Sequence, residues 1–173
     1  MEEIVNRVAK SDIITLNLED FYQHGDRVQI DIKERLFQGM VLREKDFRDF
    51  IMNTDWTSYQ DKFVAIHCSI DAIIPTWAYM LLASSLHPYA SKVVFGDLIA
   101  LEQALFQEQL STLDSNDFID CRVVIKGCGH IPVPDFAYVE LTRILRPVVQ
   151  SIMYGEPCST VPIYKRSKSK SGE

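Results

Sequence analysis

Residues 62–68, Lys-Phe-Val-Ala-Ile-His-Cys, decide the fold class of this chain. Their apolar run is nearly continuous, which is typical of a parallel strand covered on both faces. Pro75 suits the first turn of a following helix, residues 76–86. Residues 92–96, Lys-Val-Val-Phe-Gly, then read as a second short strand. This order predicts a βαβ unit with a right-handed crossover.

The same alternation of strand and helix continues toward the C-terminus. Asp97 is the expected N-cap of a helix over residues 98–110. Residues 122–128, Arg-Val-Val-Ile-Lys-Gly-Cys, form the third expected strand. A helix is expected over residues 137–153, with a kink at Pro147. The β-α-β-α-β-α order predicts an α/β fold, a three-layer sandwich with a mainly parallel central sheet.

The N-terminal part has a different pattern. Apolar residues alternate over residues 14–18 and again over residues 28–32, which indicates two strands with one buried face each. The intervening His24-Gly25-Asp26 predicts a β-hairpin between them. A helix follows in residues 43–53. We expect this hairpin and helix to extend or flank the central sheet.

The length and composition fit one globular domain. The chain has 173 residues, of which 47% are hydrophobic and 24% charged. No internal repeat or interior linker is evident, so we expect a single α/β domain over residues 1–164. Residues 165–173 have four basic residues, one acidic residue and no apolar residue, which predicts a disordered basic tail.

Charge and hydropathy narrow the classes of function. The net charge of -6 and the pI near 5.2 argue against a nucleic-acid partner. No apolar run approaches the roughly 20 residues of a membrane span, and the N-terminus lacks the apolar core of a signal peptide. We therefore expect a cytoplasmic protein. In that reducing compartment the four irregularly spaced cysteines indicate free thiols or metal ligands rather than disulfides.

Three of the cysteines are expected where α/β proteins bind ligands. Cys68 and Cys128 each end an expected strand, and Cys158 lies in the loop sequence Gly-Glu-Pro-Cys-Ser. Ligands bind beyond the carboxyl ends of the strands in open α/β sheets. If both strands lie in one sheet, Cys68 and Cys128 are neighbours. Cys158 joins them if its loop folds back over the sheet edge.

Three thiolates at one place suit zinc or iron, including an iron–sulfur cluster. Asp71 and His130 are the candidates for a further ligand, because each lies two or three residues beyond a cysteine. His67 is a weaker candidate, since neighbouring side chains of a strand point to opposite faces. Gly127 and Gly129 flank Cys128 and permit a close backbone approach.

Two other interpretations remain open at this point. In the first, the protein is an enzyme in which Cys128 is the nucleophile, His130 the base and Asp71 the orienting acid, acting on sulfane sulfur or an acyl group. In the second, the chain is a non-catalytic interaction module whose cysteines only pack in its core. No phosphate-binding or dinucleotide-binding glycine motif is present.

Several segments resemble a known family. They are NRVAKSDIITLNLEDFY, DIKERLFQG, DAIIPTWAYMLLA, KVVFGDL, VVIKGCG and SIMYGEPCSTVPIYKR, and they extend from Asn6 to Arg166. Together they are similar to an uncharacterised bacterial family, domain of unknown function 2480. Genes of this family often lie beside those of the sulfur-mobilisation system. The resemblance therefore implies an accessory role in iron–sulfur cluster assembly, with components of that machinery as partners.

Overall fold

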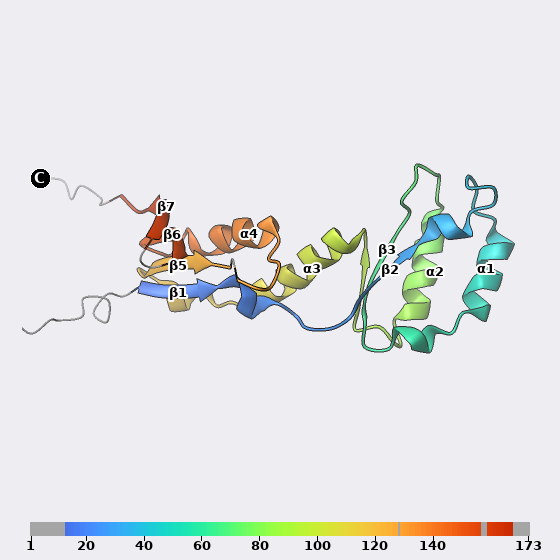
Figure 1. The fold of residues 1–173 in the computed structure, drawn as a ribbon, viewed down its shortest axis with the longest axis horizontal. Coiled ribbons are helices and arrows are strands. Elements are labelled where there is room, and N and C mark those ends of the chain that lie inside the picture. The colour runs from blue at the N-terminus through green and yellow to red at the C-terminus, as the bar shows by residue number, and fades with distance from the viewer. Residues whose placement is uncertain (1–12, 128, 157–158, 168–173) are drawn as a thin grey trace, which may run out of the picture. The chain divides into compact units, whose positions relative to one another are not determined.

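The computed structural model describes residues 13–127, 129–156 and 159–167. The contacts within the chain form two compact units (Figure 1). The single domain expected over residues 1–164 stays a prediction. Unit 2 is the continuous segment Gln23–Leu105, and unit 1 is formed by the chain on both sides of it. Unit 2 is therefore an insertion in unit 1, and helix α3, Leu98–Leu110, contributes to both.

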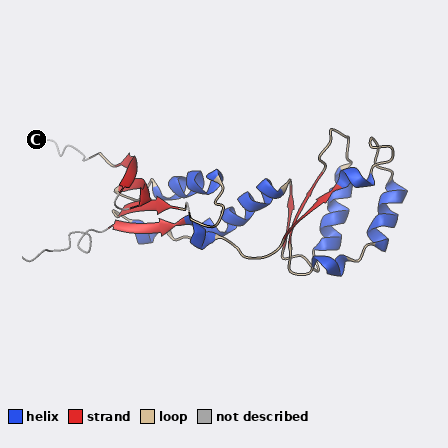
Figure 2. Ribbon diagram, in the orientation of Figure 1, coloured by secondary structure: helices blue, strands red, loops and turns tan. Residues whose placement is uncertain are grey.

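Unit 2 has three layers. Its sheet consists of three parallel strands in the order β2-β3-β4, which are Arg27–Asp31, Phe63–His67 and Lys92–Phe95. Helices α1, Glu44–Asn53, and α2, Thr76–Leu86, lie side by side (Figure 2). Both pack on one face of the sheet. The first half of α3 packs on the other face, where Leu101 and Leu105 contact Phe63 and Ala65. This unit confirms the expected three-layer α/β architecture.

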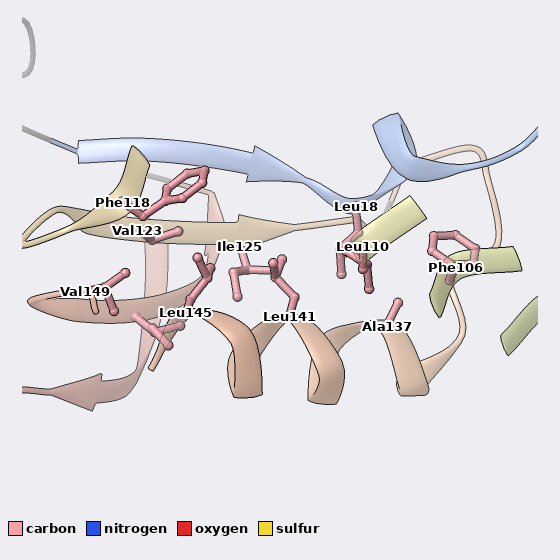
Figure 3. Packing of buried hydrophobic residues seen from close by; sticks show 11 residues of the cluster. Leu18, Phe106, Leu110, Phe118, Val123, Ile125, Ala137, Leu141, Leu145 and Val149 are labelled. Carbon is pink, nitrogen blue, oxygen red and sulfur yellow. The ribbon is translucent and has the colours of Figure 1, made fainter. Parts of the chain in front are cut away.

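Unit 1 has a four-stranded sheet in the order β1-β5-β6-β7. The strands are Ile13–Asn17, Arg122–Lys126, Ser151–Glu156 and Ser159–Lys165, and only β7 is antiparallel to its neighbour. Helix α4, Asp135–Leu145, covers one face of this sheet. Its apolar residues Leu141 and Leu145 point toward the sheet residues Val123 and Ile125, and Ala137 lies nearer Leu110 and Phe106 (Figure 3).

The N-terminal strands do not pair with each other. β1 pairs in parallel with β5, and β2 pairs in parallel with β3. After β1 the chain forms the short 3-10 helix η1, Leu18–Phe21, and does not turn back toward β1. An alternating apolar pattern indicates a strand with one buried face, but it does not specify the partner of that strand. The expected hairpin is thus replaced by two separate parallel pairings.

The last predicted helix is shorter than expected. α4 ends at Leu145, and residues 151–156 form β6 rather than helix. Pro147 lacks the N–H that would continue the helix, and its ring would clash with the helix backbone. Gly155, just after the expected helix, has a positive φ of 116° within β6. At the C-terminus, Lys165 ends β7 and the Arg166 amide donates to the Gln150 carbonyl oxygen.

The two units share an internal repeat. In unit 2, β2 is followed by η2 (Ile32–Arg35), α1, η3 (Trp56–Tyr59), β3, α2 and β4. In unit 1, β1 is followed by η1, and after the insertion by α3, η4 (Ser115–Phe118), β5, α4 and β6. The order of elements is the same in both. β7 has no counterpart in unit 2.

From η3 and η4 onward the repeat has a constant spacing of 59 residues without a gap, whereas the first elements, β1 with η1 and β2 with η2, are 14 residues apart. η3 and η4 begin at residues 56 and 115, β3 and β5 at 63 and 122, and α2 and α4 at 76 and 135. Equivalent positions carry the same residue in a series of pairs. These are Phe47/Phe106, Asp55/Asp114, Asp61/Asp120, Val64/Val123, Ile66/Ile125, Pro75/Pro134, Ala78/Ala137, Tyr79/Tyr138, Leu82/Leu141, Leu86/Leu145, Pro88/Pro147 and Gly96/Gly155.

Backbone geometry repeats with the sequence. Asp61 and Asp120 have positive φ angles of 59° and 58°. Their amides donate to the carbonyl oxygens of Tyr89 and Val148 at 2.9 and 3.0 Å. The repeat was not evident in the sequence because the identical residues are mostly common apolar and turn residues, separated by positions that differ.

Among the described residues, the helices are all too short or too polar to cross a membrane.

Candidate functional site

The structure changes the expected relation between the predicted thiols. Cys68 follows β3 in unit 2, whereas Cys128 follows β5, which belongs to the sheet of unit 1. The argument that one sheet brings these two cysteines together is therefore wrong. Cys128 and Cys158 lie outside the described residues. Their convergence with Cys68 stays a prediction.

The remaining predicted ligands are described, and both are exposed. Asp71 lies in the loop between β3 and α2 of unit 2, and His130 lies in the loop between β5 and α4 of unit 1. Within residues 13–127, 129–156 and 159–167, no group of three or more His, Cys, Asp and Glu side chains has the geometry of a metal site. The role of Asp71 and His130 as ligands stays a prediction.

A pocket lies at the carboxyl ends of the parallel strands of unit 1. Its volume is about 220 Å³. β1 contributes Asn17, β5 contributes Lys126, and β6 contributes Tyr154 and Glu156. It is also lined by Glu19, Gly127, Gly129 and Gly155. This is the position at which open α/β sheets bind ligands.

Two charged side chains in this pocket come from the carboxyl ends of the neighbouring strands β5 and β6. Lys126 Nζ lies 3.8 Å from Glu156 Oε1. The parallel pairing of β5 with β6 places Ile125 opposite Tyr154, so both strands end at the same edge. Both side chains remain partly exposed, at 36% and 63%, so the ion pair contributes little to stability. The pairing of β5 with β6 places the starts of the two following loops at this edge, and the ion pair marks that position.

Glu19 holds the loop that follows β5. Its Oε1 accepts a hydrogen bond of 2.5 Å from the Gly129 amide, across 110 residues of sequence. A Cβ at Gly129 would collide with the Glu19 carboxylate, and one at Gly127 would lie 2.7 Å from Tyr138 Oη. A side chain at either position would therefore displace the Glu19 carboxylate or the Tyr138 hydroxyl from its present place. The groups that approach these glycines are the Glu19 carboxylate of η1 and the Tyr138 hydroxyl of α4.

The equivalent edge of unit 2 carries different chemistry. Asn17 and Lys126 correspond to Asp31 and His67, which are paired across β2 and β3. Asp31 Oδ1 accepts hydrogen bonds from the amides of Lys33 and Ser69 at 3.0 and 3.1 Å. Burial raises the pKa of Asp31, but the hydrogen bonds from Ser69 and Lys33 outweigh it and lower this pKa to about 2. Asp31 is therefore ionised at neutral pH.

Three further side chains surround Asp31 in unit 2. His67 Nε2 is buried, has no hydrogen-bond partner among the described residues, and lies 3.9 Å from Asp31 Oδ2. Cys68 is half-buried, and its Sγ lies 3.5 Å from the Ile70 carbonyl oxygen. Burial raises the pKa of Tyr79, with smaller contributions from the charges of Cys68 and Asp31. Cys68 is thus near Tyr79, whereas no described contact links Asp71 to Asp31, His67, Cys68 or Tyr79.

Sequence reasoning missed Glu19 and Asp31. Each lies at or just beyond the end of an N-terminal strand, where a 3-10 helix begins. The available signal was the repeated pattern of an Asn or Asp that ends an alternating strand and is followed by one apolar residue and two charged residues. That signal becomes useful only once the two N-terminal strands are recognised as equivalent.

These features define an α/β protein built from two related parallel units, with polar residues gathered at the carboxyl ends of the strands in each. The family model described as Protein of unknown function (DUF2480) matches residues 2–166, so the chain belongs to this family. No curated protein and no solved structure matches the chain. The family assignment confirms the resemblance and supplies no activity.

Proposed function

We propose that the chain binds a transition metal, zinc or iron, at the carboxyl-end pocket of unit 1, through Cys128 and Cys158. The observation that carries the proposal is the 3.8 Å ion pair between Lys126 and Glu156. Each cysteine follows one member of this pair by two residues, a stretch that spans at most about 7 Å. Both cysteines are therefore close in sequence to residues that meet at this edge of unit 1.

The surrounding donors suit such a site. His130 lies in the same loop as Cys128, and Glu19 and Glu156 line the pocket with carboxylate oxygens. Thiolate, imidazole and carboxylate are the ligands that zinc prefers, and thiolates also hold iron and its clusters. Two thiolates with a nitrogen or oxygen donor from this group complete a site. Cys68 and Asp71 belong to unit 2 and are not needed for it.

The biological role we propose is accessory to iron–sulfur cluster assembly in the cytoplasm. A protein that holds iron or a cluster transiently needs exchangeable ligands, and ligands on loops at a partly open pocket allow exchange. Components of the assembly machinery would be its partners. Two arguments support this role. One is the proposed ligation by thiols, and the other is the frequent position of this family's genes beside those of the sulfur-mobilisation system.

Metal analysis of the full chain, purified without oxygen, tests the metal site. We expect about one zinc or iron per chain, lost in C128S and in C158S. C121S is the matched control, because Cys121 precedes β5 at the opposite end of that strand. C68S should also retain the metal. Substoichiometric metal under every anaerobic loading condition, or metal unaffected by C128S and C158S, would contradict the proposal.

A second candidate function is thiol chemistry by Cys128 on sulfane sulfur or an acyl group. The observation that favours it is the ammonium group of Lys126, two residues before Cys128, since a nearby cation stabilises a thiolate. Iodoacetamide labelling of the metal-free chain across pH tests it. One thiol should react with a midpoint well below about 8.5, and K126Q should raise that midpoint. Equal and slow labelling of all four thiols excludes it.

A further inference from the structure

β4 is the counterpart of β6, but only β6 is covered on its outer side. The internal repeat aligns Lys92–Phe95 with residues 151–154 of β6. β6 lies between β5 and β7. Among the described residues, β4 pairs only with β3, so its outer edge has no strand partner. An open edge presents unpaired backbone donors and acceptors to another strand.

β7 covers β6 with a definite pattern of side chains. It runs antiparallel to β6 and places Val161 opposite Tyr154. It also places Tyr164 opposite Ile152. Each pair joins an aromatic residue to a β-branched one, which is a favourable cross-strand combination. In unit 1 this edge of the repeat is therefore covered by an antiparallel strand that pairs aromatic with β-branched side chains.

β4 carries the same two side-chain types without a cover. Val93 and Phe95 stand where unit 1 has Ile152 and Tyr154. The aromatic contacts also repeat, since the ring centroids of Tyr79 and Phe95 lie 5.0 Å apart and those of Tyr138 and Tyr154 5.7 Å apart. Phe95 is nevertheless 69% exposed, whereas Tyr154 is half-buried. On an open edge strand, such an exposed aromatic residue is available for a cross-strand pair with a second chain.

We propose that two copies of this chain form a two-fold dimer by antiparallel pairing of their β4 strands. With the two-fold axis at Val94, Val93 lies opposite Phe95 of the partner subunit, and Phe95 lies opposite Val93 of the partner subunit. Both pairs join an aromatic and a β-branched residue, as β7 does on β6.

No like charges meet in this register. Lys92 lies opposite Gly96 of the partner subunit. Antiparallel pairing of two identical strands is also compatible with two-fold symmetry, because both subunits contribute the same surface to the interface. The dimer joins the three-stranded sheet of unit 2 in one copy to that of the other, which gives one six-stranded sheet. β4 of the second copy then takes the place that β7 has in unit 1. The proposal is independent of the metal site, because β4 belongs to unit 2 and the pocket to unit 1.

Sedimentation of the full chain between about 1 and 100 µM tests the dimer. We expect a concentration-dependent dimer whose dissociation constant rises at least about tenfold in F95D. M52D is the matched control, because Met52 is 73% exposed on α1, away from β4. Circular dichroism should show that both variants keep the wild-type secondary structure. A monomer at every concentration, or a dimer that F95D leaves unchanged, would overturn the proposal.

A cross-link tests the register independently of affinity. Val94 lies opposite itself in the proposed pairing, at a Cα separation of about 4.5–5.5 Å that a disulfide can bridge. Mild oxidation of V94C should give a covalent dimer in which mass spectrometry finds two copies of the peptide containing residue 94 joined. V161C, on β7, is the control and should not cross-link in this way. A dimer of V94C without this cross-link would refute β4 pairing.

Discussion

The Gly129 amide donates a 2.5 Å hydrogen bond to Oε1 of Glu19, and this contact joins the loop after β5 to the 3-10 helix after β1. It closes one wall of the pocket at the carboxyl ends of the strands. The bond joins a side-chain carboxyl oxygen to a backbone amide, and hydrogen bonds from backbone amides to carboxylates are stronger than those between neutral groups. It holds the backbone of Gly129, next to His130 in the loop after β5.

Removal of this contact should loosen the loop. We expect E19A to lower the free energy of unfolding by about 1–2 kcal/mol in urea titrations, and to weaken metal retention if the pocket is the metal site. D20A is the matched control, because Asp20 is the exposed neighbour in the same 3-10 helix, and it should stay within about 0.5 kcal/mol of wild type. Equal effects of both variants would show that the loop does not depend on Glu19.

Asp31 should hold unit 2 through its acceptor oxygens more than through its charge. One oxygen accepts from the amides of both Lys33 and Ser69. D31A removes these acceptors and should cost about 2 kcal/mol in the free energy of unfolding, whereas D31N keeps one oxygen and should cost about half as much. N17D places the Asp of unit 2 at the equivalent position of unit 1 and should be nearly neutral. A D31N variant as unstable as D31A would show that the charge dominates.

The stability contributed by Glu140 should disappear in acid. Hydrogen bonds from Arg143 lower the pKa of Glu140 most strongly, burial opposes this, and the Gln107 amide lowers it further, so that it falls from 4.5 to about 2. Because the folded state binds the proton more weakly than the unfolded state, this contribution is complete above pH 4.5 and is lost as the pH falls toward 2.

E140Q tests this pH dependence. At pH 7 the variant should be less stable than wild type by about 1–2 kcal/mol, and the difference should shrink steadily below pH 4.5. E44Q is the control, because Glu44 forms an exposed pair with Arg48 on α1 and should change stability little at any pH. A difference that is constant between pH 7 and pH 2.5 would exclude linkage to the Glu140 carboxyl.

The β6–β7 hairpin should depend on glycine at residue 155. Gly155 has a φ of 116°, and a Cβ there would lie 2.7 Å from the Ser159 carbonyl oxygen. G155A should destabilise the protein by about 1–3 kcal/mol through backbone strain and this clash. Gly39 also has a positive φ, 69°, but a Cβ there meets no atom within 4 Å. G39A should therefore cost less, and a reversed order in thermal melts would contradict this account.

Much of the secondary structure follows from local sequence. The continuous apolar runs around Val64 and Val123 predict buried parallel strands, and both form. Asp97 was expected to cap the third helix, and its Oδ1 accepts from the Ala100 amide at 2.9 Å. These predictions succeed because the pattern of burial and the chemistry of a helix end are set by residues close in sequence.

The pairing of strands was not predictable in the same way. Ile14 and Ile30 both lie in alternating strands, yet each belongs to a different sheet and pairs with a strand much later in the chain. Strand partners are chosen by the total burial that a topology achieves, which local patterns do not record. This failure also removed the reason for placing Cys68 beside Cys128, because that expectation assumed one sheet.

The sequence by itself determined the α/β class, the parallel strands, and the position of polar and thiol residues just beyond the strand ends. The tertiary structure alone decided that the strands divide into two related units, which strand ends share an edge, and that β6 is covered while β4 is not. The reason is physical. Hydrophobic periodicity is a local property of the chain, whereas sheet membership and edge protection arise from contacts between residues far apart in sequence.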